Sequence, residues 1–190
     1  LSRAFGSLRS AWEATESHLR SAGLDADTAA NLLRVRAQVD LEREIGKIEQ
    51  AKATLLTPDD ETYPALLRNL PDAPIALYLR GSLTEQDDLA LAVVGTRKAS
   101  GYGRDAAAHF SRELARQDVT IVSGLAHGID AAAHRATLDA GGRTIAVLGC
   151  GIDRVYPPDH ADLARQIAHQ GALISEFPVG SKPEARQFPR

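Results

Sequence analysis

The sequence lacks the features of secreted and membrane proteins. It has one cysteine, Cys150, so no disulfide can form within the chain, which fits a reducing compartment. No apolar run approaches the roughly 18–20 residues of a membrane-spanning helix, and no signal-peptide pattern opens the chain. The net charge is −3, so a uniformly basic surface is also absent. Any anion-binding site is therefore expected to be local.

Methionine is absent, and the first residue is Leu1. The chain stops at Phe188-Pro189-Arg190 without a helix cap or a polar tail. We therefore expect the sequence to be part of a longer protein that extends beyond both ends, with its second domain truncated at Arg190.

Proline is absent before Pro58, and this absence helps to divide the chain. Residues 1–53 are rich in Leu and Ala, and Ala29, Leu32 and Leu33 recur at helical spacing. We expect a small helical domain over residues 1–53 and a second domain over 54–190. A protein contact, a DNA contact and simple packing all fit the helical domain.

The second domain alternates short apolar segments with amphipathic ones. Strands are expected at 75–79, 89–94, 119–122, 144–148 and 172–175, and helices at 104–117, 129–140 and 159–169. Strands that are apolar throughout indicate a parallel sheet covered on both faces. Right-handed crossovers then predict an α/β fold with a Rossmann-like, doubly wound, mainly parallel sheet.

The expected strand ends carry residues suited to an anion. In open parallel sheets, ligands bind beyond the carboxyl ends of the strands. Glycines allow backbone N–H groups to approach a ligand, hydroxyls add donors, and arginine adds a charged fork. The candidates for contact with the anion are Gly95, Thr96, Arg97, Ser123, Gly124, Ala126 and Gly128, and those for support of the pocket are Asp130, Ser175 and Glu176. Each glycine alone could reflect turn geometry, and Asp130 could be a helix-start residue, but their concurrence predicts a phosphate-binding cleft.

Several other sites are not supported. Gly101-Tyr-Gly103-Arg-Asp-Ala106 matches G-x-G-x-x-A, but it starts well beyond the expected strand. The next strand ends in Ser123-Gly124, without an acidic residue to bind a ribose. His127 and His134 have no metal-ligand partners at a convincing spacing, and one cysteine gives no zinc motif. We expect neither a cofactor nor a metal.

The last stretch has no strand or helix period. It places Lys182, Arg186 and Arg190 around the aromatic ring of Phe188. Cations beside an aromatic ring are typical of single-stranded nucleic-acid binding, although a solvated tail has the same composition.

A series of short motifs follows in order between Leu56 and Arg190: Tyr63-Pro64, Val94-Gly95-Thr96-Arg97, Ser123-Gly124-Leu125-Ala126, Gly128-Ile129-Asp130, Gly149-Cys150-Gly151, Tyr156-Pro157, Ser175-Glu176 and Phe188-Pro189. Together these motifs resemble those of the DNA-processing protein A family (DprA, also called Smf) of bacterial natural transformation. The family usually has Ser or Ala at the position of Thr96, and it continues past the final Phe-Pro into further sheet elements.

The resemblance implies a protein without enzymatic activity that acts in competent cells. It would bind single-stranded DNA, load the RecA recombinase onto it, and form a cytoplasmic homodimer. Arg97 would contact a phosphate, Phe188 would stack on a base, and Asp130 would brace the pocket. Backbone N–H and hydroxyl groups of Gly95, Ser123, Gly124, Ala126 and Gly128 would line that pocket, and Lys182, Arg186 and Arg190 would follow the strand.

Two other classes of function remain open at this point. An enzyme that removes phosphoribosyl from nucleoside monophosphates would share the glycine-rich turn, with Glu176 as the candidate catalytic carboxylate. A pure protein-interaction module would leave the glycines at the strand ends unexplained.

Overall fold

The computed structural model describes residues 2–187, so Leu1 and residues 188–190 lie outside the described part. The chain divides into two compact units, residues 1–46 and 47–190. The sequence predicted this boundary after residue 53. The division falls earlier, within helix α5 (Leu41–Gln50), and Ala51 and Ala53, which follow this helix, pack against the core of the larger unit.

The smaller unit is helical, and polar side chains begin its helices. Ser7, Thr15 and Asp25 each accept a hydrogen bond from the backbone N–H three residues later, which satisfies a donor that the first helical turn leaves unpaired. Leu19 and Ala29 are fully buried in its small core. Its helices are α1 (Ser2–Phe5), α2 (Leu8–Glu13), α3 (Glu16–Ser21), α4 (Ala26–Gln38) and the start of α5.

The larger unit is built on a six-stranded sheet in the order β1-β2-β6-β5-β4-β3. Strands β3 to β6 are parallel, whereas β1 and β2 run antiparallel to their neighbours. The predicted α/β fold with a mainly parallel sheet is therefore confirmed, although β1 was not foreseen. The strands are β1 (Thr54–Leu56), β2 (Leu77–Gly81), β3 (Ala90–Ala92), β4 (Thr120–Ser123), β5 (Thr144–Leu148) and β6 (Ala172–Ser175).

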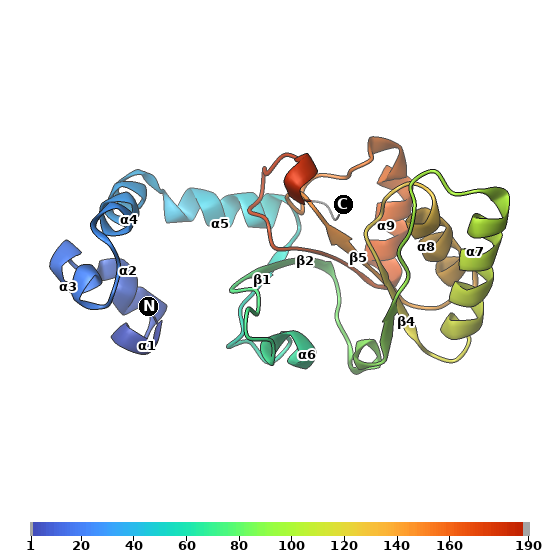
Figure 1. The fold of residues 1–190 in the computed structure, drawn as a ribbon, viewed down its shortest axis with the longest axis horizontal. Helices are drawn as coiled ribbons and strands as arrows, with labels where there is room; N and C mark the ends of the chain where they lie inside the picture. The colour runs from blue at the N-terminus through green and yellow to red at the C-terminus, as the bar shows by residue number, and fades with distance from the viewer. Residues whose placement is uncertain (1, 188–190) are drawn as a thin grey trace. The chain divides into compact units, whose positions relative to one another are not determined.

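The helices between the parallel strands are α7 (Gly101–Ala115), α8 (Ile129–Asp139) and α9 (Ala161–Gln170), and they lie beside one another in Figure 1. The steps from β3 to β6 all run in the same direction across the sheet, so right-handed crossovers place these helices on one face. Leu148 and Leu173 of the sheet pack there against Leu163 and Ile167 of α9. The described chain thus differs from the expectation of helices on both faces.

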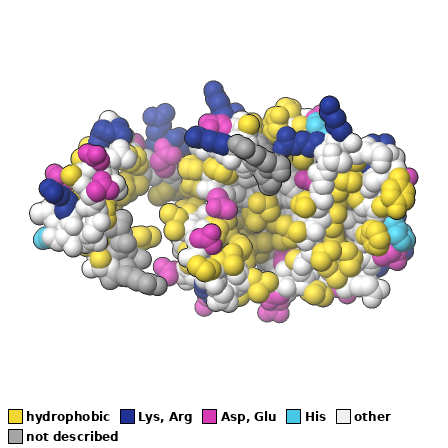
Figure 2. Space-filling view, in the orientation of Figure 1, with side chains coloured by type: hydrophobic (Ala, Val, Ile, Leu, Met, Phe, Trp, Pro, Cys, Tyr) yellow, Lys and Arg dark blue, Asp and Glu magenta, His cyan; other side chains and the backbone are white. Residues whose placement is uncertain are grey.

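The opposite face is covered in part by the segment that contains α6 (Ala65–Arg68). Tyr63 of this segment is buried against Leu77 and Leu79 of β2, and its hydroxyl donates to the Pro74 carbonyl at 2.8 Å. Beyond this segment the face is open, since the side chain of Val147 in β5 is 41% exposed. Figure 2 shows hydrophobic side chains gathered in the hollow of this face. None of the helices over residues 2–187 has the length and apolar character needed to cross a membrane.

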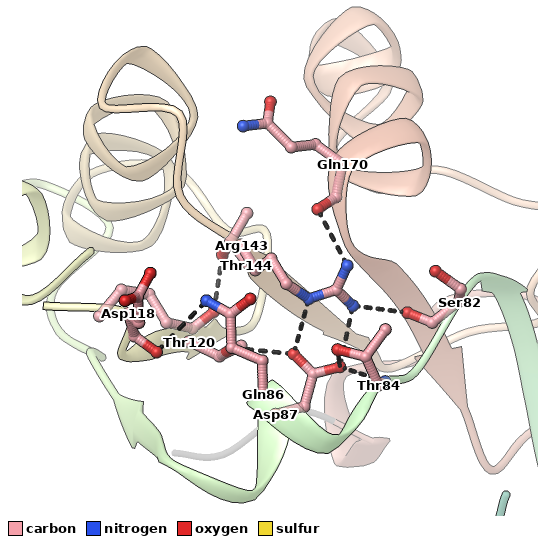
Figure 3. Close-up of polar contacts among 10 residues, drawn as sticks. Ser82, Thr84, Gln86, Asp87, Asp118, Thr120, Arg143, Thr144 and Gln170 are labelled. Carbon is pink, nitrogen blue, oxygen red and sulfur yellow. Dashed lines mark hydrogen bonds and ion pairs between the residues drawn. The ribbon is translucent and has the colours of Figure 1, made fainter. Parts of the chain in front are cut away.

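A buried ion pair holds the amino edge of the parallel sheet (Figure 3). Arg143, just before β5, donates from Nε and Nη2 to the two carboxylate oxygens of Asp87, at 3.0 and 2.8 Å. Asp87 lies in the short helix η1 (Glu85–Asp88) and also accepts from the Thr120 hydroxyl at 2.8 Å. Arg143 further donates to the Ser82 carbonyl at 2.8 Å, so one guanidinium joins β2, η1 and β5.

The charge state of Asp87 follows from these contacts. Burial by itself would raise the pKa of this carboxyl. Hydrogen bonds from Arg143, from the Thr84 N–H and from Thr120 outweigh that effect, so the pKa of Asp87 lies below its usual value. The carboxylate therefore stays ionised beside Arg143.

Candidate nucleic-acid interface

The turn after β3 lies directly against the loop between β4 and α8. Gly128 has φ +80°, and a Cβ there would lie 2.2 Å from the Thr96 carbonyl oxygen and 2.8 Å from that of Arg97. A Cβ on Gly95 would lie 2.6 Å from Ile129 Cγ1. These glycines therefore let the two backbones touch, and the structure brings Gly95, Thr96 and Arg97 together with Gly128.

Asp130 fills the inside of the β4–α8 loop. Its side chain is buried, and Oδ2 accepts hydrogen bonds from the N–H groups of Gly124 at 3.1 Å and Ala126 at 3.3 Å. These two N–H groups were expected to line a phosphate pocket. In the structure the protein's own carboxylate already accepts their hydrogen bonds, so Asp130 braces the loop, as the sequence predicted for this residue.

The two serine hydroxyls at the strand ends are also used internally. The buried Ser123 donates to the Val93 carbonyl at 2.6 Å, which links the ends of β4 and β3. The buried Ser175 donates to the Cys150 carbonyl at 2.6 Å and accepts from the Phe177 N–H at 3.0 Å. Both hydroxyls hold neighbouring strand ends in position, which for Ser175 is the supporting role expected of it, whereas Ser123 was expected to contact the phosphate.

One group of residues at these loops, the Arg97 turn, is defined by Gly95, Thr96, Arg97, His127 and Gly128. The side chains of Thr96, Arg97 and His127 are exposed. Over residues 2–187, the N–H groups of His127 and Gly128 donate no hydrogen bond to the protein. They precede the first turn of α8, where the helix dipole favours an anion. The Arg97 turn therefore offers a guanidinium, a hydroxyl and backbone donors on one surface.

The other expected site residues lie at the ends of β5 and β6. Gly180 donates to Asp153 Oδ1 at 2.7 Å, and Gly151 donates to the Ser181 carbonyl at 3.0 Å, so the segment before Lys182 is anchored to the loop after β5. The side chains of Lys182 and Glu176 are exposed.

Arg186 is exposed too, and it forms an ion pair with Glu184 at 2.8 Å. Lys182 and Arg186 both follow β6, which β5 separates from β4 in the sheet. Phe188 and Arg190 lie outside the described residues.

One polar cluster at this edge was missed from the sequence. His127 lies near Asp159 and His160, which come from the loop after β5. The sequence analysis discounted His127 because no ligand partner is close to it along the chain. The available signal was topological: loops that follow the neighbouring parallel strands β4 and β5 meet at one edge of the sheet.

Known proteins with similar sequences carry consistent descriptions. A sequence model of the family described as DNA recombination-mediator protein A matches residues 54–190. Protein Smf of Synechocystis sp. is 46% identical over 145 residues, which cover 74% of this chain and 36% of that protein. Protein Smf of Escherichia coli is 40% identical over 185 residues, which cover 94% of this chain and 49% of that protein. The chain thus spans less than half the length of these two relatives.

Solved structures agree with the sequence matches. DNA processing protein A from Streptococcus pneumoniae has a TM-score of 0.79 at 32% identity, over 92% of this chain and 60% of that one. DNA processing protein A from Helicobacter pylori, whose structure concerns a single-stranded DNA binding mode, has a TM-score of 0.62 at 31% identity, over 73% of this chain and 62% of that one. On the strength of the family match over residues 54–190, the chain belongs to the DNA recombination-mediator protein A family.

Proposed function

We propose that this chain binds single-stranded DNA through the Arg97 turn. The observation that carries the proposal is the exposed guanidinium of Arg97 beside backbone donors at the start of α8. Family membership supports DNA as the ligand, as does the single-stranded DNA binding mode of the Helicobacter pylori relative.

The path of the strand follows from the two groups of cations. One phosphate would lie on the Arg97 turn, and the DNA strand would continue along the carboxyl edge of the sheet toward Lys182 and Arg186. Phe188 and Arg190, outside the described residues, would add a stacking surface and a further charge. Contacts to phosphates and base faces carry little sequence information, so we expect weak sequence preference.

The negative net charge is compatible with this function. The chain has a net charge of −3, but binding depends on the cations that face the phosphates. Phosphate contacts release counterions from the DNA, so affinity should fall as salt concentration rises.

We further propose that the full-length protein is a recombination mediator of natural transformation. It would load RecA onto single-stranded DNA, act as a cytoplasmic homodimer and catalyse no reaction itself, without a cofactor. The family resemblance supports these properties. They concern the whole protein, of which this chain spans less than half in the curated relatives compared above.

The alternative, a nucleotide hydrolase that uses Glu176, is less well supported. Glu176 follows β6, and the Arg97 turn follows β3 and precedes α8. Strand β5 lies between β6 and β4, so the carboxylate starts about 10 Å or more from the Arg97 turn, whereas the glycosidic bond that it would have to reach lies on the ribose that carries the phosphate. A catalytic carboxylate must lie within hydrogen-bond reach of the reacting group.

The test is fluorescence anisotropy of a labelled oligo-dT and of the matching duplex, using the full-length protein across a salt series. We expect tight, salt-sensitive binding to the single strand, and about 10- to 100-fold weaker binding by Arg97→Ala, because a charge-assisted hydrogen bond is lost.

Arg116→Ala is the matched control, since Arg116 is exposed at the other end of α7, in an ion pair with Glu113. Absence of binding by the intact protein at low salt would reject the proposal. An equal loss in Arg116→Ala would reject the placement of the site.

A further inference from the structure

Three potential metal ligands from two loops converge at the carboxyl edge of the sheet. His127 comes from the β4–α8 loop, and Asp159 and His160 come from the short helix η2 (Pro158–His160). One ligand atom of each lies within 4.8 Å of the others. His127 Nε2 is 3.8 Å from Asp159 Oδ1, and the two imidazole centroids are 4.8 Å apart with the rings edge to face. The proposed DNA binding uses neither Asp159 nor His160.

The surroundings of His160 orient its ring so that one nitrogen can bind a metal. Nδ1 lies 2.8 Å from the Leu125 carbonyl oxygen. A carbonyl can only accept a hydrogen bond, so Nδ1 carries the proton and Nε2 carries the lone pair. Metal-binding imidazoles are commonly oriented in this way by a backbone carbonyl. The ring of His160 is buried, so its position is fixed by packing.

The two other ligands can adjust around this fixed ring. A tetrahedral zinc ion has Zn–N bonds of about 2.0–2.1 Å, which places its ligand atoms about 3.3 Å apart. In this structure the ligand atoms of the three residues are farther apart than they would be around a bound zinc ion, by about 0.5–1.5 Å. The side chains of His127 and Asp159 are 51% and 68% exposed, so both can rotate toward an ion held at His160.

We propose that His127, Asp159 and His160 bind a first-row divalent cation, of which Zn²⁺ is the best match. Two imidazole nitrogens and one carboxylate oxygen form a ligand set that Zn²⁺ accepts. Three protein ligands leave a fourth position for water or for the oxygen of an anion. The competing interpretation is an ordinary ion pair between protonated His127 and Asp159.

The test uses tag-free full-length protein titrated with Zn²⁺ in competition with a chromogenic chelator. We expect one strong site per chain. His127→Ala and Asp159→Asn should each weaken it by at least about 10- to 100-fold, since loss of a ligand should cost no less than loss of a supporting contact. His169→Ala is the matched control, because His169 is exposed on α9 and outside the cluster. Circular dichroism checks that each variant stays folded.

Binding of Co²⁺ distinguishes a defined metal site from nonspecific binding to the protein surface. Co²⁺ at the cluster should give the intense visible absorption of four- or five-coordinate cobalt, and His127→Ala should abolish it. Zn²⁺ binding no stronger than that of His127→Ala would overturn the proposal, as would equal losses in His127→Ala and His169→Ala. An octahedral Co²⁺ spectrum that persists in His127→Ala would do the same.

Discussion

The two edges of the parallel sheet each carry an arginine, and each edge uses it differently. At the amino edge, the Arg143 side chain is 16% exposed, and its guanidinium bonds both oxygens of Asp87 (Figure 3). At the carboxyl edge, Arg97 is exposed on a turn whose neighbouring N–H groups have no partner within residues 2–187. Arginine thus stabilises the fold at the amino edge, where it is buried against Asp87, whereas at the carboxyl edge the exposed Arg97 lies on a surface that a ligand can reach.

The largest effect should come from breaking the amino-edge ion pair. Arg143→Ala leaves the Asp87 carboxylate without its buried partner, so we expect a loss of about 3–5 kcal/mol in the free energy of unfolding. Urea denaturation of the single variant measures this loss. Arg116→Ala should change stability by less than about 1 kcal/mol, because its ion pair is exposed.

A double-mutant cycle with Asp87→Ala sharpens this result. The doubly substituted protein should lose less stability than the sum of the single losses, because neither charge is then left alone. Simple additivity would show that Asp87 and Arg143 do not act as a pair.

Removing the Asp130 carboxylate, which holds the β4–α8 loop at the carboxyl edge, should have the next largest effect on stability. Asp130→Ala leaves the N–H groups of Gly124 and Ala126 without their acceptor, and we expect about 2–3 kcal/mol lower stability. Oligo-dT affinity should also fall, since the loop that carries Gly128 would loosen. Unchanged affinity in a measurably destabilised variant would show that Asp130 supports the fold alone.

A smaller effect, visible as a pH dependence, concerns His134 near the amino edge. This histidine is fully buried, and Nδ1 bonds the Thr144 hydroxyl at 2.7 Å, whose own proton goes to the Ile121 carbonyl. Burial, with smaller contributions from His160 and Arg135, lowers the pKa of His134 to about 3. The folded state therefore holds the neutral ring, and the unfolded state takes up a proton below about pH 6.5.

Stability should consequently be complete above about pH 6.5 and decline as the pH falls toward 3. Between pH 7 and pH 5 we expect a loss of about 2 kcal/mol in the free energy of unfolding. His134→Gln should flatten this slope in urea denaturation series, and an unchanged slope would assign it to other groups.

The sequence predicted the periodic parts of this fold well. Alternation of apolar strands with amphipathic helices is a local signal, and it located β4, β5 and β6 together with α7, α8 and α9. Strand β1 was missed because its three residues precede Pro58 and show no clear period. The one-sided helical layer depends on strand order, which local patterns do not encode.

The sequence located the loops at the strand ends but not their hydrogen bonds. Glycines after strands located the Arg97 turn, because only a residue without Cβ allows the close contact between Gly128 and Thr96. The partners of Ser123 and Asp130 depend on side-chain directions in three dimensions. The cluster of His127 with His160 joins two separate loops, so no local spacing could reveal it.

The bond from Asp130 to its own loop has a consequence for the thermodynamics of recognition. A loop closed by an internal carboxylate takes its shape when the protein folds, so the entropy lost in ordering it does not reduce the affinity for a ligand. DNA binding at the Arg97 turn should then leave the hydrogen-exchange protection of the Gly124 and Ala126 amides nearly unchanged. The surface would receive its ligand as a rigid, preorganised template.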